Sequence, residues 1–251
     1  MTPKIHITMP RSWQELDDQQ LYYVYGLIAD NLSGAQIRTF CLFRWGHLSV
    51  VCRYADGYLI KQGKHEYYTD VEHIACALKA LMWIEDISEK PVRISVIKKH
   101  QAVDATLNGV PFEDYLYLEN LYQGFLATTR HDLLNEMGQL LYDDDKLMLS
   151  QAEKMNVFYW WTSLKAYFAK QFPNFYVPAS TPNGGNLLGN TKPIGVQLQE
   201  AMNAQIRALT KGDITKEKEV LAMDTWRALT ELDALAREAE EWQRKYGNKS
   251  R

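Results

Sequence analysis

The sequence predicts an α+β protein, with a mostly helical body that contains one small antiparallel β-sheet and a C-terminal antiparallel αα-hairpin. Three observations predict this class. Apolar residues recur at helical spacing through most of the chain. The period becomes strand-like between residues 48 and 60. The last part carries one regular helical stripe. The 251 residues suffice for one large domain or two modest ones, and we expect a body at 1–172, a linker or loop at 173–193 and the hairpin at 194–251.

The N-terminal elements follow from capping and turn signals. Ser12 and Glu15 have the spacing of a capping box and predict a helix that stops before Gly34. A second helix is expected at 35–45. Residues 48–54 are rich in β-branched side chains, Asp56-Gly57 is a two-residue hairpin signal, and residues 58–60 form the returning strand.

A second capping box, Thr69 to Glu72, predicts a helix at about 70–85. Its expected inner face carries Ile74, Ala77, Leu78, Leu81 and Met82. A further strand is expected at 92–97, and Asn108-Gly109 indicates a turn.

After Pro111 the chain reads as helical at 112–127, 131–142 and 150–171. Ser150 and Glu153 form a third capping box at the start of the last of these helices. This helix is apolar around most of its circumference, so we expect it at the centre of the core. Residues 173–193 hold four prolines, three glycines and four asparagines, which indicates a linker or surface loop. Two helices, at about 196–211 and 213–245, follow and are joined at Gly212.

The second of these helices carries the most informative pattern. Apolar or small residues follow alternating steps of four and three: Leu221, Thr225, Ala228, Leu232, Leu235, Ala239, Trp242 and Tyr246. Such a stripe must pack on something, which is this chain, a copy of it or another protein. We predict a partner-binding set of Met223, Trp226, Leu232, Leu235 and Trp242, with Trp226 as its anchor. The alternative is that the hairpin packs on the N-terminal body and buries both faces.

Bulk composition limits the function classes. The net charge of −3 provides no general attraction for nucleic acid, and no apolar run approaches the roughly 20 residues that span a bilayer. We expect no signal peptide and no membrane contact. The three cysteines, Cys41, Cys52 and Cys76, predict reduced, buried thiols in a cytoplasmic protein.

Candidate chemistry is sparse. The stretch 184–191 has the spacing of a phosphate-binding loop but places Asn190 where the lysine belongs. His73 and Cys76 share a helix face and with Cys52 or His65 would make a zinc site, but no CxxC pair supports it. The run 143–145 lacks the glycine and distal glutamate of a calcium loop. We therefore expect no catalytic residue, no metal and no cofactor.

A nucleic-acid-associated accessory protein is the alternative function. Lys98, Lys99 and His100 form a small basic cluster near Arg93. The hairpin at 48–60 and the residue after it add basic and aromatic side chains, namely Arg53, Tyr54, Tyr58 and Lys61. Strand faces that bind single-stranded nucleic acid combine these residue types, but they also need a basic surplus that this chain lacks.

Two stretches resemble proteins encoded among the tail genes of bacterial prophages. The first comprises Phe112-Glu113-Asp114-Tyr115-Leu116, Glu119-Asn120 and Leu140-Leu141-Tyr142. The second comprises Ala201-Met202-Asn203-Ala204-Gln205 and residues 221–241. The nearest class is the phage tail-assembly chaperone. The resemblance implies a non-catalytic protein that binds a tail subunit and a cytoplasmic location in a bacterial host. A homo-oligomer is a further possibility.

Overall fold

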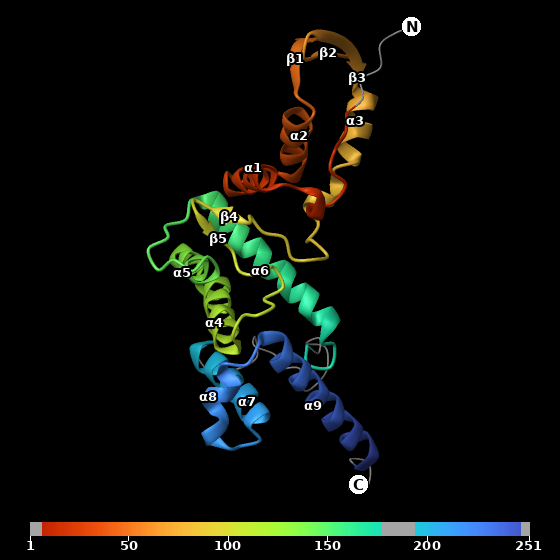
Figure 1. Ribbon diagram of the computed structural model, residues 1–251. Helices are drawn as coiled ribbons and strands as arrows, with labels where there is room; N and C mark the ends of the chain where they lie inside the picture. The colour runs from red at the N-terminus through yellow and green to blue at the C-terminus, as the bar shows by residue number, and fades with distance from the viewer. Residues whose placement is uncertain (1–6, 177–193, 247–251) are drawn as a thin grey trace. The chain divides into compact units, whose positions relative to one another are not determined.

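The computed structural model describes residues 7–176 and 194–246 (Figure 1). They form two compact units, each of which is discontinuous in sequence. The first unit holds the described residues up to Ser88, together with Val92–Ile94 and Ser150–Asn156. The second holds Glu89–Pro91, Ser95–Leu149 and the described residues from Val157 onward. The expected body at 1–172 is therefore divided between the units, and the C-terminal helices join the second.

The first unit begins with a short turn of helix instead of the long helix predicted from Ser12. Its helices are η1 (Trp13–Glu15), α1 (Asp18–Ala29), α2 (Gly34–Trp45), α3 (Val71–Lys79) and η2 (Met82–Glu85). The Ser12 side chain makes no capping hydrogen bond, and the Glu15 carboxylate accepts the backbone N–H of Arg11. The capping box that opens α1 is formed by Asp17 and Gln20.

A three-stranded antiparallel sheet follows α2, in the order β1 (Leu48–Arg53), β2 (Gly57–Gln62) and β3 (His65–Asp70). The predicted hairpin is confirmed, but its two turn residues are Ala55 and Asp56, because Tyr54 N–H donates to the Gly57 carbonyl. Gly57 lies in β2, where a Cβ atom would come within 2.4 Å of the Thr69 carbonyl oxygen. The third strand was not predicted.

The core of the first unit is rich in tryptophan. The Trp13 ring stacks on Tyr25 at 5.8 Å and meets Trp83 edge-on at 5.7 Å. Trp45 stacks on Trp83 in turn. The helices α2 and α3 lie side by side with the sheet at one end (Figure 1). The backbone N–H of Ile94 donates to Asn156 Oδ1 at 2.8 Å. This hydrogen bond holds the segment around Ile94 in the first unit.

The second unit contains the remaining helices and a two-stranded sheet. Its elements are β4 (Val96–Ile97), β5 (His100–Gln101), α4 (Phe112–Thr128), α5 (His131–Leu141), α7 (Ile194–Thr210), η3 (Ile214–Lys216), α8 (Glu217–Leu221) and α9 (Thr225–Tyr246). The helix α6 (Gln151–Gln171) begins in the first unit and continues into the second. The α+β class is confirmed.

The central position predicted for α6 is also confirmed. Its residues in the second unit include Val157, Trp160, Trp161, Leu164 and Phe168, all fully buried. Burial also requires partners for the two indole N–H groups. Trp160 Nε1 donates to the Ala105 carbonyl at 2.8 Å, and Trp161 Nε1 donates to Glu119 Oε2 at 3.0 Å.

The predicted linker at 173–193 lies outside the described residues except for 173–176, which belong to the second unit. The Asp233 carboxylate of α9 accepts the backbone N–H groups of Asn174, at 2.7 Å, and Phe175, at 3.0 Å. The hydroxyl groups of Tyr176 and Tyr115 are hydrogen-bonded to each other. These contacts make 173–176 part of the packed unit and not of a linker.

Candidate interaction surface

The helix predicted at 213–245 is interrupted at residues 222–224, and this break determines where α9 begins. Here the backbone pairs with a distant segment: Met223 accepts the N–H of Phe112 at 2.8 Å, and Thr225 donates to the Val110 carbonyl at 2.9 Å. Pro111 and Asp224 form an isolated antiparallel bridge. Backbone groups used in this pairing cannot also continue a helix. Leu221 is therefore separated from the rest of the stripe.

Asp224 fixes the start of α9. Its Oδ1 atom accepts the backbone N–H groups of Trp226, at 3.0 Å, and Arg227, at 3.2 Å. Its Oδ2 atom accepts the N–H of Gly109 at 2.6 Å. One carboxylate thus satisfies two N–H groups of the first helical turn and binds the loop before α4.

Trp226 was predicted to be an exposed anchor for a partner, but in the structure its side chain packs against aromatic rings of its own chain. Its side chain is half-buried, and Nε1 donates to the Thr106 carbonyl at 2.7 Å. Its ring lies 5.4 Å from that of Phe172, 5.6 Å from Phe168 and 6.0 Å from Tyr167, all edge-on. Because its ring and its N–H both have partners within this chain, Trp226 is a packing residue of the second unit.

The first half of α9 is an internal element. Thr225, Ala228, Leu229 and Leu232 are buried. Leu232 is therefore not available to a partner, contrary to the predicted partner-binding set. Met223 is half-buried, and its carbonyl is used in the pairing with Phe112. Of the alternatives given for the stripe, packing on its own chain agrees with the burial of this half of α9.

The second half of α9 is exposed to solvent. Leu235 is half-buried, and every residue from Arg237 to Tyr246 is exposed. Trp242 is 65% exposed and Tyr246 52%, and their ring centroids lie 5.4 Å apart. In Figure 1 this half of α9 extends away from α7 and α8. We call Leu235, Ala239, Trp242 and Tyr246 the distal stripe.

Charged residues surround the distal stripe. Glu240 and Arg244 form an i,i+4 ion pair of 3.5 Å. Glu238 precedes Ala239, and Lys245 precedes Tyr246, so both of these charges flank the stripe on one side. The distal stripe thus combines an apolar seam with a charged rim, which is the anatomy of a protein–protein contact.

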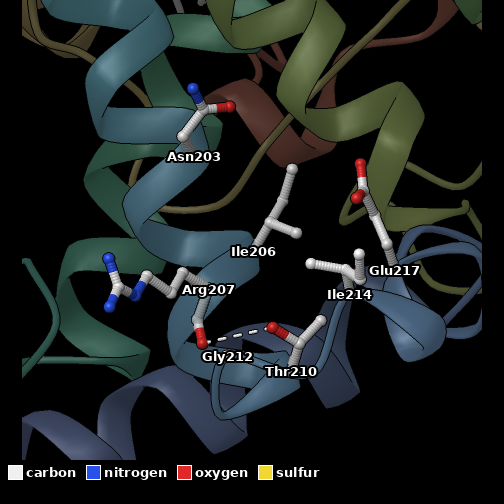
Figure 2. A pocket seen from close by; sticks show the side chains of 7 residues that line it. All are labelled: Asn203, Ile206, Arg207, Thr210, Gly212, Ile214 and Glu217. Atoms are coloured by element: carbon white, nitrogen blue, oxygen red, sulfur yellow. Dashed lines mark hydrogen bonds between the residues drawn. The ribbon is translucent and has the colours of Figure 1, made fainter.

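A hollow of about 360 Å³ lies beside α7 in the second unit (Figure 2). Ile206 and Ile214 point toward one another across it, and Arg207 and Glu217 are among its lining residues. Ile214 is 82% exposed. We assign no reaction to this hollow.

The other candidate sites do not assemble. Within residues 7–176 and 194–246, no three His, Cys, Asp or Glu side chains gather as metal ligands would. His73 is hydrogen-bonded to Asp70, and Cys52 and Cys76 are exposed, contrary to the prediction of three buried thiols. The phosphate-loop spacing at 184–191 lies outside the described residues.

The residues of the nucleic-acid alternative fall in different units. Arg53, Tyr54, Tyr58 and Lys61 belong to the sheet region of the first unit, whereas the Lys98-Lys99 pair lies in the second. Lys98 Nζ donates to the Met148 carbonyl at 3.0 Å. His100 Nε2 lies 3.1 Å from Asp144 Oδ2, so one residue of the run 143–145 has a partner within the second unit.

None of the described helices is both long and apolar enough to cross a bilayer. Comparison with known proteins finds no matching family model, no matching curated protein and no matching solved structure.

Proposed function

We propose that this protein is a non-catalytic assembly factor that acts through protein–protein contacts, with the distal stripe as its contact surface. The observation that carries the proposal is the pair Trp242 and Tyr246, two large aromatic side chains exposed together on one helix face. Exposed aromatic groups of this kind are typical anchors of interfaces, because they bury a large area at little entropic cost.

The biological setting that we propose is the assembly of a bacteriophage tail in the cytoplasm of a bacterial host. The support is the resemblance of two sets of short stretches to proteins of prophage tail-gene clusters, namely 112–116, 119–120 and 140–142, and 201–205 with 221–241. The partner would then be a tail subunit, and the protein would need neither a cofactor nor a catalytic residue. A helix that offers an apolar stripe to a groove of its partner is a common recognition mode.

Co-purification with the products of neighbouring tail genes tests this proposal. We expect Trp242→Ala to weaken binding of the tail subunit by about 30-fold or more. Glu241→Ala is the matched control, because Glu241 is exposed on the same half of α9 and lies outside the stripe. Equal binding by the wild type and Trp242→Ala would show that the distal stripe is not the contact surface. Assembly of complete tails in a strain that lacks the gene would show that the protein is not needed for tail assembly.

A further inference from the structure

The distal stripe is complementary to itself when two copies of it run in opposite directions. We infer that it binds the distal stripe of a second copy of this chain as an antiparallel helix pair. The inference rests on the proposed function, since it names a partner for the same surface.

Side-chain size supports this pairing. The stripe from Leu235 to Tyr246 has the three–four spacing of a coiled-coil seam and extends roughly 18 Å at about 1.5 Å per residue. In an antiparallel pair centred between Ala239 and Trp242, each Trp242 ring lies over the small Ala239 of the other copy. Leu235 then meets Tyr246 of the other copy. Each exposed ring is thus matched by a smaller or half-buried residue.

Charge supports the same alignment. Glu238 and Lys245 flank the seam on the same side, at equivalent positions of successive heptads. In the antiparallel pair, Glu238 of each copy lies opposite Lys245 of the other, which creates two symmetric ion pairs. Glu240 and Arg244 already pair with each other, at 3.5 Å, and lie on the face away from the seam. The alignment set by side-chain size is therefore also the one that brings opposite charges together.

A parallel pair lacks both features. It would place Trp242 against Trp242 and Ala239 against Ala239, so that bulky and small layers alternate. Glu238 would lie opposite Gln243 of the second copy, with no opposite charge to meet. The two directions can therefore be separated by a charge exchange.

The contact is small. Two tryptophans, two tyrosines and their smaller neighbours bury less than the roughly 1,200 Å² of a standard stable interface. Self-association is expected with a dissociation constant on the order of 10–100 µM. At lower concentration the chain is a monomer, and its distal stripe is open to a different partner.

Sedimentation equilibrium of the full chain, at concentrations from about 5 µM to about 1 mM, tests the inference. We expect a monomer–dimer equilibrium that Trp242→Ala weakens at least 10-fold. Lys245→Glu places carboxylates opposite each other and should weaken the dimer about 5-fold or more. The double variant Glu238→Lys/Lys245→Glu exchanges the charges and should restore wild-type association. Circular dichroism verifies that each variant keeps its helix content.

Three outcomes would overturn the inference: a wild type that stays monomeric, a Trp242→Ala dimer of unchanged affinity, or a double variant no tighter than Lys245→Glu. The same variants, tested for binding to the tail subunit, separate this failure from failure of the proposed function. If the wild type is monomeric but Trp242→Ala loses the tail subunit, only the self-pairing is wrong. If Trp242→Ala changes neither quantity, both proposals fail.

Discussion

The indole N–H of Trp226 donates to the backbone carbonyl of Thr106, at a distance of 2.7 Å and across 120 residues of sequence. Together with the bond from Gly109 N–H to Asp224, it fastens the loop before α4 to the start of α9. Side chains at the beginning of α9 therefore hold the second unit together, whereas those near its end are exposed.

The two tryptophans of α9 should respond differently to truncation. We expect Trp226→Ala to lower the free energy of unfolding by about 3–5 kcal/mol, because a packed aromatic cluster loses its central ring. Trp226→Phe keeps a ring and loses the hydrogen bond, at a cost of roughly 1–2 kcal/mol. Trp242→Ala should change stability by no more than about 0.5 kcal/mol. Urea denaturation measures all three, and equal losses at the two positions would contradict this division of α9.

Asp224 should contribute more than an ordinary helix cap. Asp224→Ala removes the cap of α9 and leaves the Gly109 N–H without its carboxylate acceptor, so we expect a loss of roughly 2–3 kcal/mol. The control is Asp213→Ala, because Asp213 caps only the short exposed η3 and should cost about 1 kcal/mol or less. Thermal denaturation compares the variants. Similar midpoints would show that the link between Gly109 and α9 is not important for stability.

The three thiols should fall into two classes of reactivity. Burial raises the pKa of the Cys41 thiol to about 12, so that thiol stays protonated near neutral pH, whereas Cys52 and Cys76 are exposed. With a disulfide reagent at pH 8, we expect two fast thiols and a third that reacts only in denaturant. Cys52→Ser should remove one fast equivalent and leave the slow one unchanged. A fast reaction at Cys41 would show that the core of the first unit opens readily.

Asp233 should make stability depend on pH at the acidic end. Partial burial alone would raise the pKa of its carboxyl, but hydrogen bonds from Asn174 and Phe175 outweigh it and lower the pKa. The folded pKa thus lies below the unfolded one, so the folded state binds the proton less tightly. The stabilisation is complete above the unfolded pKa, about 3.9, and is lost as the pH falls through the folded pKa.

The measurement for Asp233 is the thermal midpoint from pH 6 down to about pH 3. Asp233→Asn should lower the midpoint at pH 6 and approach the wild type as the pH falls. A constant difference between the two proteins across this range would contradict a role for the ionised carboxylate.

Local patterns were good predictors where local interactions decide the structure. The apolar circumference of α6 indicated its central burial, and the β-branched run before Asp56 indicated the hairpin. The predicted position of the turn was wrong by one residue. Gly57 suggested a turn that needs a positive φ, but this glycine lies in β2, where it allows the close approach of β3. The strand β3 was missed because no residue from His65 to Asp70 is buried, so no inward-facing alternation marks it.

Features set by distant partners could not be predicted in the same way. The break at 222–224 arises from pairing with residues 110–112, which no signal near Met223 reveals. The periodicity of α9 identified one helix face, but periodicity does not say what covers that face. Leu232 and Trp242 both lie on the stripe, yet Leu232 is buried in the second unit and Trp242 is exposed. For the proposed contact surface, the sequence indicated an apolar face of the helix but not which half of that face is exposed.

The discontinuity of the two units sets an order of events during synthesis. The first unit needs Asn156, which accepts the Ile94 N–H, yet Ser95–Leu149 are synthesised in between and belong to the second unit. At an elongation rate of roughly 5–20 residues per second, several seconds pass between the synthesis of Ser88 and that of Asn156. During that interval the residues of the tryptophan cluster are already present, but Ser150–Asn156 are still missing from the first unit. The first unit therefore cannot be completed before Asn156 has been synthesised, by which time all of Ser95–Leu149 in the second unit already exist.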